Sequence, residues 1–222
     1  MTRPALEAVP AVLSAPSGAG KTTIARALVE REEDFAFSVS ATTRSRRGGE
    51  VHGVDYWFLS QEEFRQMVGR GEFVEWAEVH GDLYGTPFSS LLAASEGGRH
   101  VLLDIDVQGA RQIREAVPEA LLLFILPPSV DVLLSRLSGR GTEGKAAIRR
   151  RLTTALDELD AAEAFDYFVV NDDLDRAIQE VRDLIRSSRG LPERPRQVPE
   201  GVRNIKSGIQ AILDQDNISD TE

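Results

Sequence analysis

Short apolar stretches alternate with segments of helical periodicity along most of the chain. The apolar stretches predict strands at residues 10–14, 35–40, 101–105, 120–126 and 167–170. Apolar residues three or four positions apart predict helices after residue 23, after Ser60, and at 87–94, 108–117, 130–137, 146–163 and 175–189. This alternation indicates an α/β fold with a parallel sheet covered by helices on both faces and with binding sites at the carboxyl ends of the strands.

Some of the predicted helices begin at recognisable capping residues. Ser60 is followed three positions later by Glu63, which predicts a capping box. Thr86 and Pro87 predict an N-cap followed by proline at the first helical position, and Ser129 predicts the cap of the helix at 130–137.

A glycine-rich turn joins the first strand to the first helix, in the stretch VLSAPSGAGKTT. Its backbone N–H groups can surround a phosphate, and the N-terminus of the following helix adds partial positive charge. The pattern predicts that Lys21 reaches the outer phosphates and that the Thr22 hydroxyl binds Mg²⁺. Ala15 stands where the usual pattern has glycine. A merely flexible turn is the alternative explanation of this stretch.

Residues 41–58 combine arginines, hydroxyl groups and glycines with little helical periodicity. Arg44, Arg46 and Arg47 lie among serines and threonines and precede Tyr56. Guanidinium groups and hydroxyls bind phosphate dianions directionally, so the segment predicts a second phosphate site. A solvated basic loop is the alternative.

Two further segments suggest phosphoryl-transfer chemistry. The strand at 101–105 ends in Asp104 and Asp106, where a carboxylate can hold Mg²⁺ through water, although two acids that simply begin a turn are the alternative. The stretch 139–144, GRGTEG, precedes three consecutive arginines at 149–151 and suits a closing lid, with an ordinary helix hairpin as the alternative.

Composition narrows the class of protein. A chain of 222 residues, 41% hydrophobic and 28% charged, is long enough for one globular domain with a small insertion and a tail. A net charge of −10 argues against a general nucleic-acid-binding surface. The chain has no cysteine, its longest apolar run (120–126) is too short to cross a bilayer, and Glu7 interrupts any signal peptide. We therefore expect a soluble cytoplasmic protein, and the sequence leaves its oligomeric state open.

Residues 10–189 resemble guanylate kinase. The resemblance rests on matching stretches in the same order: SAPSGAGKTT, SVSATTR, GEVHGVDYWF, EFVEWAEVHGDLYGT, LLDIDVQGA, FILPPS, RLSGRGTE and FVVNDDLD. It implies a P-loop three-layer α/β fold with a small GMP-binding insertion and a helical lid. It also implies transfer of the ATP γ-phosphoryl group to GMP or dGMP, giving ADP and GDP or dGDP, with Mg²⁺, in purine nucleotide metabolism.

The resemblance also implies a role for individual residues. The implied ATP-binding residues are Ser17, Gly18, Ala19, Gly20, Lys21, Thr22, Thr23 and Asn171. The implied GMP-binding residues are Ser40, Arg44, Arg47, Tyr56, Glu75, Tyr84, Thr86 and Asp106. The implied catalytic residues are Lys21, Arg44, Arg140 and Arg151, and Mg²⁺ is expected at Thr22 and, through water, at Asp104. Glu75 and Asp106 would accept hydrogen bonds from guanine N1–H and the exocyclic amine, whereas adenine presents an acceptor at N1.

The expected organisation is an N-terminal extension at 1–9, a guanylate kinase-like domain at 10–189 and a tail at 190–222. Within that domain we expect a core at 10–40 and 100–189, a GMP-binding region at about 41–99 and a lid at about 139–151. The chain departs from the family pattern at Ala41, at Arg46 and at Gly144–Lys145. We expect Ala41 to loosen the base pocket, Arg46 to compete with Arg47 for phosphate, and the lid hinge to differ. A kinase for another nucleoside monophosphate and a non-catalytic interaction domain are the alternative functions.

Overall fold

The computed structural model describes residues 9–79, 81–138, 145–187 and 198–219. The chain forms two compact units, Met1–Val12 with Leu28–Leu121 and Leu13–Ala27 with Leu122–Glu222. The predicted lid segment at 139–144, including Arg140, lies outside the described residues.

The central sheet contains the strands predicted from the apolar stretches. Its members are β1 (Ala11–Ser14), β2 (Phe35–Phe37), β7 (His100–Asp104), β8 (Leu121–Leu126) and β9 (Tyr167–Val170), in the order β2-β7-β1-β8-β9. β2 pairs parallel with β7, and β8 pairs parallel with β9. Every residue of β8 is buried, as expected for a parallel strand covered on both faces. The predicted α/β class with a parallel sheet is confirmed.

A second, four-stranded sheet belongs to the first unit. Its strands are β3 (Ala41–Thr42), β4 (Trp57–Phe58), β5 (Phe73–Val79) and β6 (Asp82–Pro87), in the order β4-β3-β6-β5. The predicted strand at 35–40 is therefore only β2, and the antiparallel β5–β6 pair is an element that the sequence pattern did not predict.

Helix α2 (Gln61–Gly69) covers this second sheet. Its capping box is confirmed, because the Ser60 N–H donates to Glu63 Oε2 at 2.7 Å and the Glu63 N–H donates to Ser60 Oγ at 3.2 Å. Its buried Phe64 stacks on Phe73 with ring centroids 4.4 Å apart. Ala41 is fully buried in the same cluster. Because the Ala41 side chain packs in this small core, the structure gives no support to the expectation that Ala41 loosens the base pocket.

Two further helices of the first unit begin close to the predicted positions. Helix α3 (Phe88–Ser95) has Pro87 as its N-cap, without a side-chain capping bond, and the short 3₁₀ helix η1 (Glu96–Gly98) follows it. The prediction that Thr86 caps this helix is wrong, because the Thr86 hydroxyl donates to Glu75 instead. Helix α4 (Val107–Ala116) begins at its N-cap Asp106.

The remaining helices follow the predicted pattern. Helix α1 (Lys21–Arg31) follows the glycine loop and spans the boundary between the two units. The second unit contains α5 (Val130–Ser138), α6 (Lys145–Asp160), the 3₁₀ helix η2 (Ala161–Ala164) and α7 (Leu174–Ser187). The Ser129 cap is confirmed, because the Val132 N–H donates to Ser129 Oγ at 3.2 Å. Apolar side chains at helical spacing are buried along α7, as the periodicity predicts.

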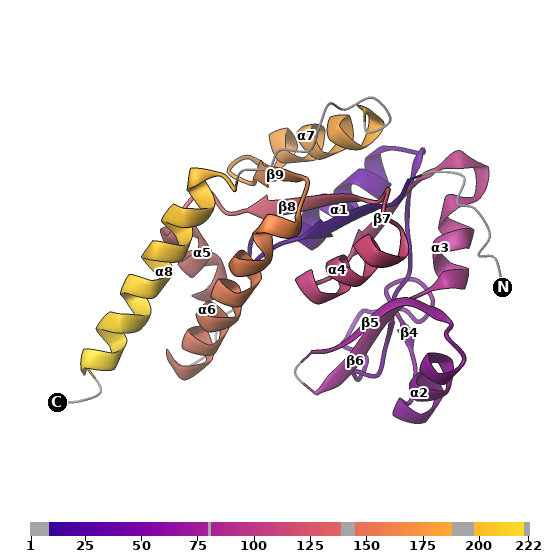
Figure 1. The fold of residues 1–222 in the computed structure, drawn as a ribbon, viewed down its shortest axis with the longest axis horizontal. Coiled ribbons are helices and arrows are strands. Elements are labelled where there is room, and N and C mark those ends of the chain that lie inside the picture. Colours follow the sequence, from indigo (N-terminus) through magenta and orange to yellow (C-terminus); the bar gives the residue numbers. More distant parts are fainter. Residues whose placement is uncertain (1–8, 80, 139–144, 188–197, 220–222) are drawn as a thin grey trace. The chain divides into compact units, whose positions relative to one another are not determined.

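The C-terminal segment contains a long helix, α8 (Glu200–Ser219), within the stretch that the sequence analysis assigns to a tail. Its buried side chains Val202, Ile205, Ile209 and Leu213 form one apolar face. Gly208 comes so close to α5 that a Cβ there would lie 2.8 Å from Val130 Cγ1. Figure 1 shows α8 running beside α6, where Lys206 pairs with Asp160. Within the described residues, no helix has the length and apolar character needed to cross a bilayer.

Candidate functional site

The glycine loop requires glycine at two positions. Gly18 and Gly20 have φ angles of +91° and +96°, a region that side chains disfavour. A Cβ on Gly20 would also lie 2.3 Å from Asn171 Nδ2. The two glycines that the sequence assigns to phosphate binding are thus needed for the shape of the loop.

The Ala19 carbonyl is held from two sides. It accepts hydrogen bonds from Asn171 Nδ2 at 2.7 Å and from Arg136 Nη1 at 3.2 Å, and Arg136 Nη2 donates to the Asn171 carbonyl at 3.0 Å. In a trans peptide the N–H of the next residue points away from that carbonyl. These contacts therefore aim the Gly20 N–H away from Asn171 and Arg136.

Helix α6 contacts the start of the loop through two side chains on one face. Glu158 Oε2 accepts a hydrogen bond from the Ser17 N–H at 3.0 Å. Arg151 donates to Ser17 Oγ at 3.2 Å and to the Leu137 carbonyl at 3.1 Å. A carboxylate and a guanidinium, seven positions apart on α6, thus fix both the backbone and the side chain of Ser17.

A pocket of about 650 Å³ opens over this loop. It is lined by Ala15, Pro16, Ser17, Gly18, Gly20, Lys21, Thr22, Thr23, Arg136, Glu158, Asn171 and Leu174. The predicted ATP-binding residues are therefore gathered here, apart from Ala19, which is buried behind the lining. Helix α1 begins at Lys21, so its partial positive charge lies at the pocket. The arrangement can bind a phosphate chain.

In the first unit, Arg44 forms a polar cluster with Glu50 and Tyr56. Its Nη1 and Nη2 donate to Glu50 Oε2 and Oε1 at 3.1 and 2.8 Å, and its guanidinium carbon lies 5.5 Å from the centroid of the Tyr56 ring. The hydrogen bond from Arg44 lowers the pKa of Glu50 to about 2, and the Arg47 N–H adds to this shift. The paired carboxylate shows that Arg44 is set for planar, bidentate oxyanion binding.

The other arginines of this segment are placed differently. The Arg47 N–H donates to Glu50 Oε2 at 2.8 Å, and its side chain lies in an exposed position. Arg46 Nε donates to the Glu50 carbonyl. Because Arg46 is bound to the backbone in this way, the structure gives no support to the expected competition between Arg46 and Arg47.

Two tyrosines lie beside Arg44. The Tyr56 and Tyr84 rings meet edge to face with centroids 6.2 Å apart. Burial raises the pKa of Tyr56 to about 12, and the negative charge of Asp104 adds to the shift. The Tyr56 hydroxyl therefore stays protonated well above neutral pH and can donate a hydrogen bond.

Glu75 is the most deeply buried carboxylate of this cluster, with 4% of the residue exposed. It lies opposite Thr86 in the β5–β6 pair, and the Thr86 hydroxyl donates to Glu75 Oε1 at 2.6 Å. A buried carboxylate with one oxygen fixed in this way suits the binding of an N–H edge.

The two acids at the carboxyl end of β7 lie in different elements. Asp104 is the last residue of the strand, and Asp106 is the N-cap of α4, where its Oδ1 accepts from the Gly109 N–H at 2.8 Å. The alternative interpretation, that these acids begin a turn, therefore holds for Asp106, whose Oδ2 is not used by this cap.

Ser40 lies between β2 and β3, and its carbonyl accepts from the Trp57 N–H at 2.8 Å.

The sequence did not identify three residues of these clusters: Glu50, Arg136 and Glu158. Each forms a hydrogen bond with a backbone group that lies in a turn or far away in the sequence. Hydrophobic periodicity does not predict such contacts. Only Glu158 carried a signal, because it lies seven positions after Arg151 and therefore on the same face of α6.

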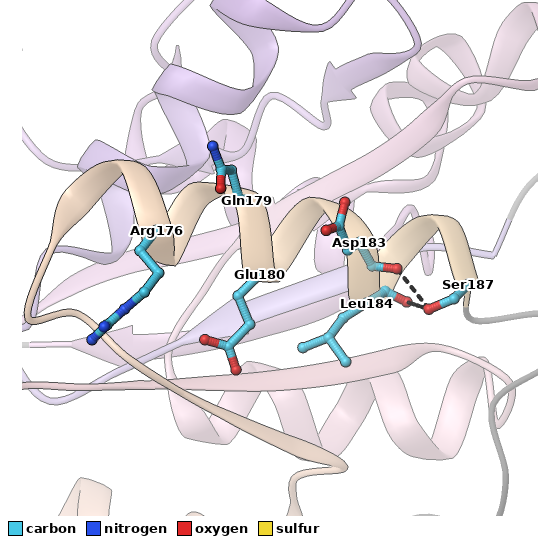
Figure 2. A pocket seen from close by; sticks show the side chains of 6 residues that line it. All are labelled: Arg176, Gln179, Glu180, Asp183, Leu184 and Ser187. Carbon is cyan, nitrogen blue, oxygen red and sulfur yellow. Dashed lines mark hydrogen bonds between the residues drawn. The ribbon is translucent and has the colours of Figure 1, made fainter.

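A separate hollow of about 420 Å³ lies along α7. Figure 2 shows its lining side chains, which all come from this helix: Arg176, Gln179, Glu180, Asp183, Leu184 and Ser187. The Ser187 hydroxyl bonds to the carbonyls of Asp183 and Leu184 within the helix. Burial raises the pKa of Glu180. None of the predicted site residues lies in this hollow.

The strand, the glycine loop ending in Lys21 and Thr22, and helix α1 define a nucleotide-binding protein of the P-loop class. Comparison with known proteins narrows this class. The family model described as guanylate kinase matches residues 7–188. The chain belongs to the guanylate kinase family.

Curated relatives support this assignment over most of their length. The guanylate kinase of Nitratidesulfovibrio vulgaris is 53% identical over 77% of this chain and 83% of its own. The guanylate kinase of Rhodococcus jostii is 50% identical over 78% of this chain and 85% of its own. The crystal structure of guanylate kinase from Anaplasma phagocytophilum matches with a TM-score of 0.67 and 34% identity, over 86% of this chain and 90% of that one.

Proposed function

We propose that the two residue clusters are the donor and acceptor half-sites of a guanylate kinase reaction. The chain is an ATP-dependent guanylate kinase by family, and its reaction is the transfer of a phosphoryl group from ATP to GMP. One observation best supports the assignment of two half-sites. The chain contains both a pocket over a glycine loop and a buried carboxylate, Glu75, in the same cluster as the bidentate Arg44. We propose that dGMP also accepts the phosphoryl group.

The ATP half-site consists of the pocket over the glycine loop. The loop N–H groups and the N-terminus of α1 bind the phosphate chain, and Lys21 carries positive charge to the outer phosphates. Arg151 and Arg140 stabilise charge on the transferring phosphoryl group, and Asn171 lies near the adenine. No general base is required, because the attacking GMP phosphate is already an anion and catalysis consists of positioning and electrostatic stabilisation.

The GMP half-site consists of the cluster around Arg44 and Glu75. The GMP phosphate binds Arg44, Arg47, Tyr56 and Tyr84. The base binds Glu75 and Asp106, with Ser40 and Thr86 beside it. The carboxylates accept from guanine N1–H and from its exocyclic amine. Adenine would leave the buried Glu75 facing an acceptor, and an unsatisfied buried charge strongly disfavours binding.

Magnesium fits the donor set of this chain. Mg²⁺ commonly takes one or two protein oxygens and completes its shell with substrate phosphates and water. In the described part of the chain no group of three or more His, Asp or Glu side chains forms a metal cluster, which matches a metal bound largely by ATP. The Thr22 hydroxyl and Asp104, through water, would hold the ion. When bound, it neutralises charge on the phosphates.

The replacement Lys21→Met tests the assignment of the donor half-site. It removes a cation that stabilises the transferring group, so turnover with ATP and GMP should fall by about a hundredfold to a thousandfold. Binding of GMP alone, measured by calorimetry, should change little. A coupled assay of ADP release gives the rate, and unchanged turnover in this variant would contradict the proposed role of Lys21. Wild-type rates with GMP, dGMP, AMP, UMP and dTMP measure the specificity.

A further inference from the structure

Gly109 lies in a helix, where its backbone conformation does not require glycine. It lies within α4, three residues after the N-cap Asp106. Its φ angle is not among the positive values of the chain's glycines. Alanine is more favourable than glycine inside a helix. The local backbone would therefore be more stable with alanine at this position.

The space beside Gly109 is occupied by the proposed guanine-binding carboxylate. A Cβ at Gly109 would lie 2.7 Å from Glu75 Oε2 and 3.1 Å from Glu75 Cδ. The next nearest atom is Ile105 Cδ1 at 3.3 Å. Carbon and oxygen atoms that are not bonded do not approach as closely as 2.7 Å, so the carboxylate would have to move.

Hydrogen bonds hold both sides of this close approach. Helix α4 is tied to β5 by Gln112, which lies three positions after Gly109 on the same helix face. Its Nε2 donates to the Trp76 carbonyl at 2.8 Å, and its Oε1 accepts from the Trp76 N–H at 3.1 Å. On the other side, Glu75 Oε1 is held by the Thr86 hydroxyl. Because the nearest atoms to the added Cβ belong to the carboxylate, the Glu75 carboxylate is the group that a methyl group at position 109 would displace.

We propose that Gly109 is a specificity-determining residue, whose missing side chain makes room for the Glu75 carboxylate to bind the guanine edge. This inference rests on the proposed role of Glu75. Gly109 does not contact the reacting atoms and acts through Glu75, so it is a positioning residue. The glycine is kept at a cost in helix propensity because a methyl group would displace the carboxylate from its binding orientation.

The replacement Gly109→Ala tests the proposal in the full chain. The KM for GMP should rise by about tenfold to a hundredfold, the loss expected when hydrogen bonds to a charged group are displaced. The KM for ATP should be unchanged, and the Tm should be unchanged or higher. An unchanged KM for GMP would overturn the proposal. A fall in Tm with equal rises in both KM values would also overturn it, because it would show a general folding defect.

Two control variants separate the contributions of helix propensity and crowding. Gly69, in α2, has no atom within 4 Å of its ideal Cβ position, so Gly69→Ala changes propensity alone. Gly208, in α8, is crowded by Val130 as Gly109 is by Glu75, so Gly208→Ala adds crowding away from the guanine-binding residues. Both variants should keep the wild-type KM for GMP. If Gly208→Ala raised this KM as much as Gly109→Ala, the proposal would be wrong.

A double-mutant cycle identifies the residue through which Gly109 acts. In a Glu75→Ala background there is no carboxylate to displace, so adding Gly109→Ala should not raise the KM for GMP further. A full additive rise in the double variant would overturn the proposal. The wild-type assay distinguishes failure of the proposed function, because a wild-type protein that forms no GDP would contradict guanylate kinase activity before any variant is compared.

Discussion

At the scale of single residues, Arg44 and Tyr56 show how neighbours set the state of a polar side chain. The guanidinium of Arg44 pairs with both oxygens of Glu50 and lies over the Tyr56 ring. This pairing is retained at any pH above the lowered pKa of Glu50, about 2. Tyr56 is shifted in the other sense, because burial disfavours its phenolate.

The raised pKa of Tyr56 predicts a loss of stability in alkali. The folded protein holds this proton up to about pH 12, whereas the unfolded chain releases it near pH 10. The stabilising contribution is complete below pH 10 and is lost as the pH rises to 12, with a size of about 2 to 3 kcal/mol. Urea unfolding of wild type and Tyr56→Phe at pH 8 to 12 measures it. The difference between the two free energies of unfolding should shrink by this amount, and a constant difference would contradict the shift.

The placement of site residues was predictable where a motif fixes it, and contacts were missed where they depend on the folded chain. Gly18, Gly20 and Lys21 follow from the order of strand, loop and helix. Glu50 and Arg136 were not identified, because their partners, a neighbouring arginine in a turn and the Ala19 carbonyl, are brought to them only by folding.

At the scale of elements, helix α6 acts on the glycine loop through Ser17. Glu158 accepts from the Ser17 N–H, and Arg151 donates to its hydroxyl. The helix therefore positions Ser17, which lines the pocket over the glycine loop. We therefore expect α6 to influence ATP binding through Ser17.

The replacement Glu158→Ala should raise the KM for ATP by about fivefold to thirtyfold, since one charge-assisted hydrogen bond to the loop is lost. The KM for GMP should remain at the wild-type value. Glu158→Gln is the matched control, because its amide oxygen can still accept from the Ser17 N–H, and it should retain most of the affinity. Steady-state kinetics with each substrate varied in turn measures both constants. An unaltered KM for ATP in the alanine variant would show that this contact does not position the loop.

Elements in which apolar residues recur with a clear periodicity were predicted from the sequence. Elements in which polar residues interrupt that periodicity were missed. The strand at 167–170 and the helix start after Ser60 agree with the structure. The β5–β6 pair was not predicted, because Glu75 and Thr86 place polar groups at buried positions of the two strands. The same pair explains the wrong cap at Thr86, whose hydroxyl binds a carboxylate across the sheet rather than a helix N-terminus.

At the scale of the whole molecule, helix α8 completes the apolar interior of the second unit. It lies beyond the stretch that matches the guanylate kinase family model, which ends at residue 188. Its buried face packs against α5 and α6, and Arg149 of α6 donates to the Leu213 carbonyl at 3.5 Å. The sequence did not predict this helix because three prolines precede it in a polar segment, which favoured a loose tail.

A comparison of adjacent residues on α8 measures its contribution to the fold. Ile209 is fully buried, so Ile209→Ala should lower the free energy of unfolding by about 2 to 5 kcal/mol through lost burial and the cavity it leaves. Gln210 is exposed, and Gln210→Ala should stay within about 0.5 kcal/mol of wild type. Urea unfolding of the full-length variants gives both values. Similar small effects would mean that α8 lies loosely on the second unit, whereas a large effect at Ile209 alone shows that the C-terminal segment is part of the fold.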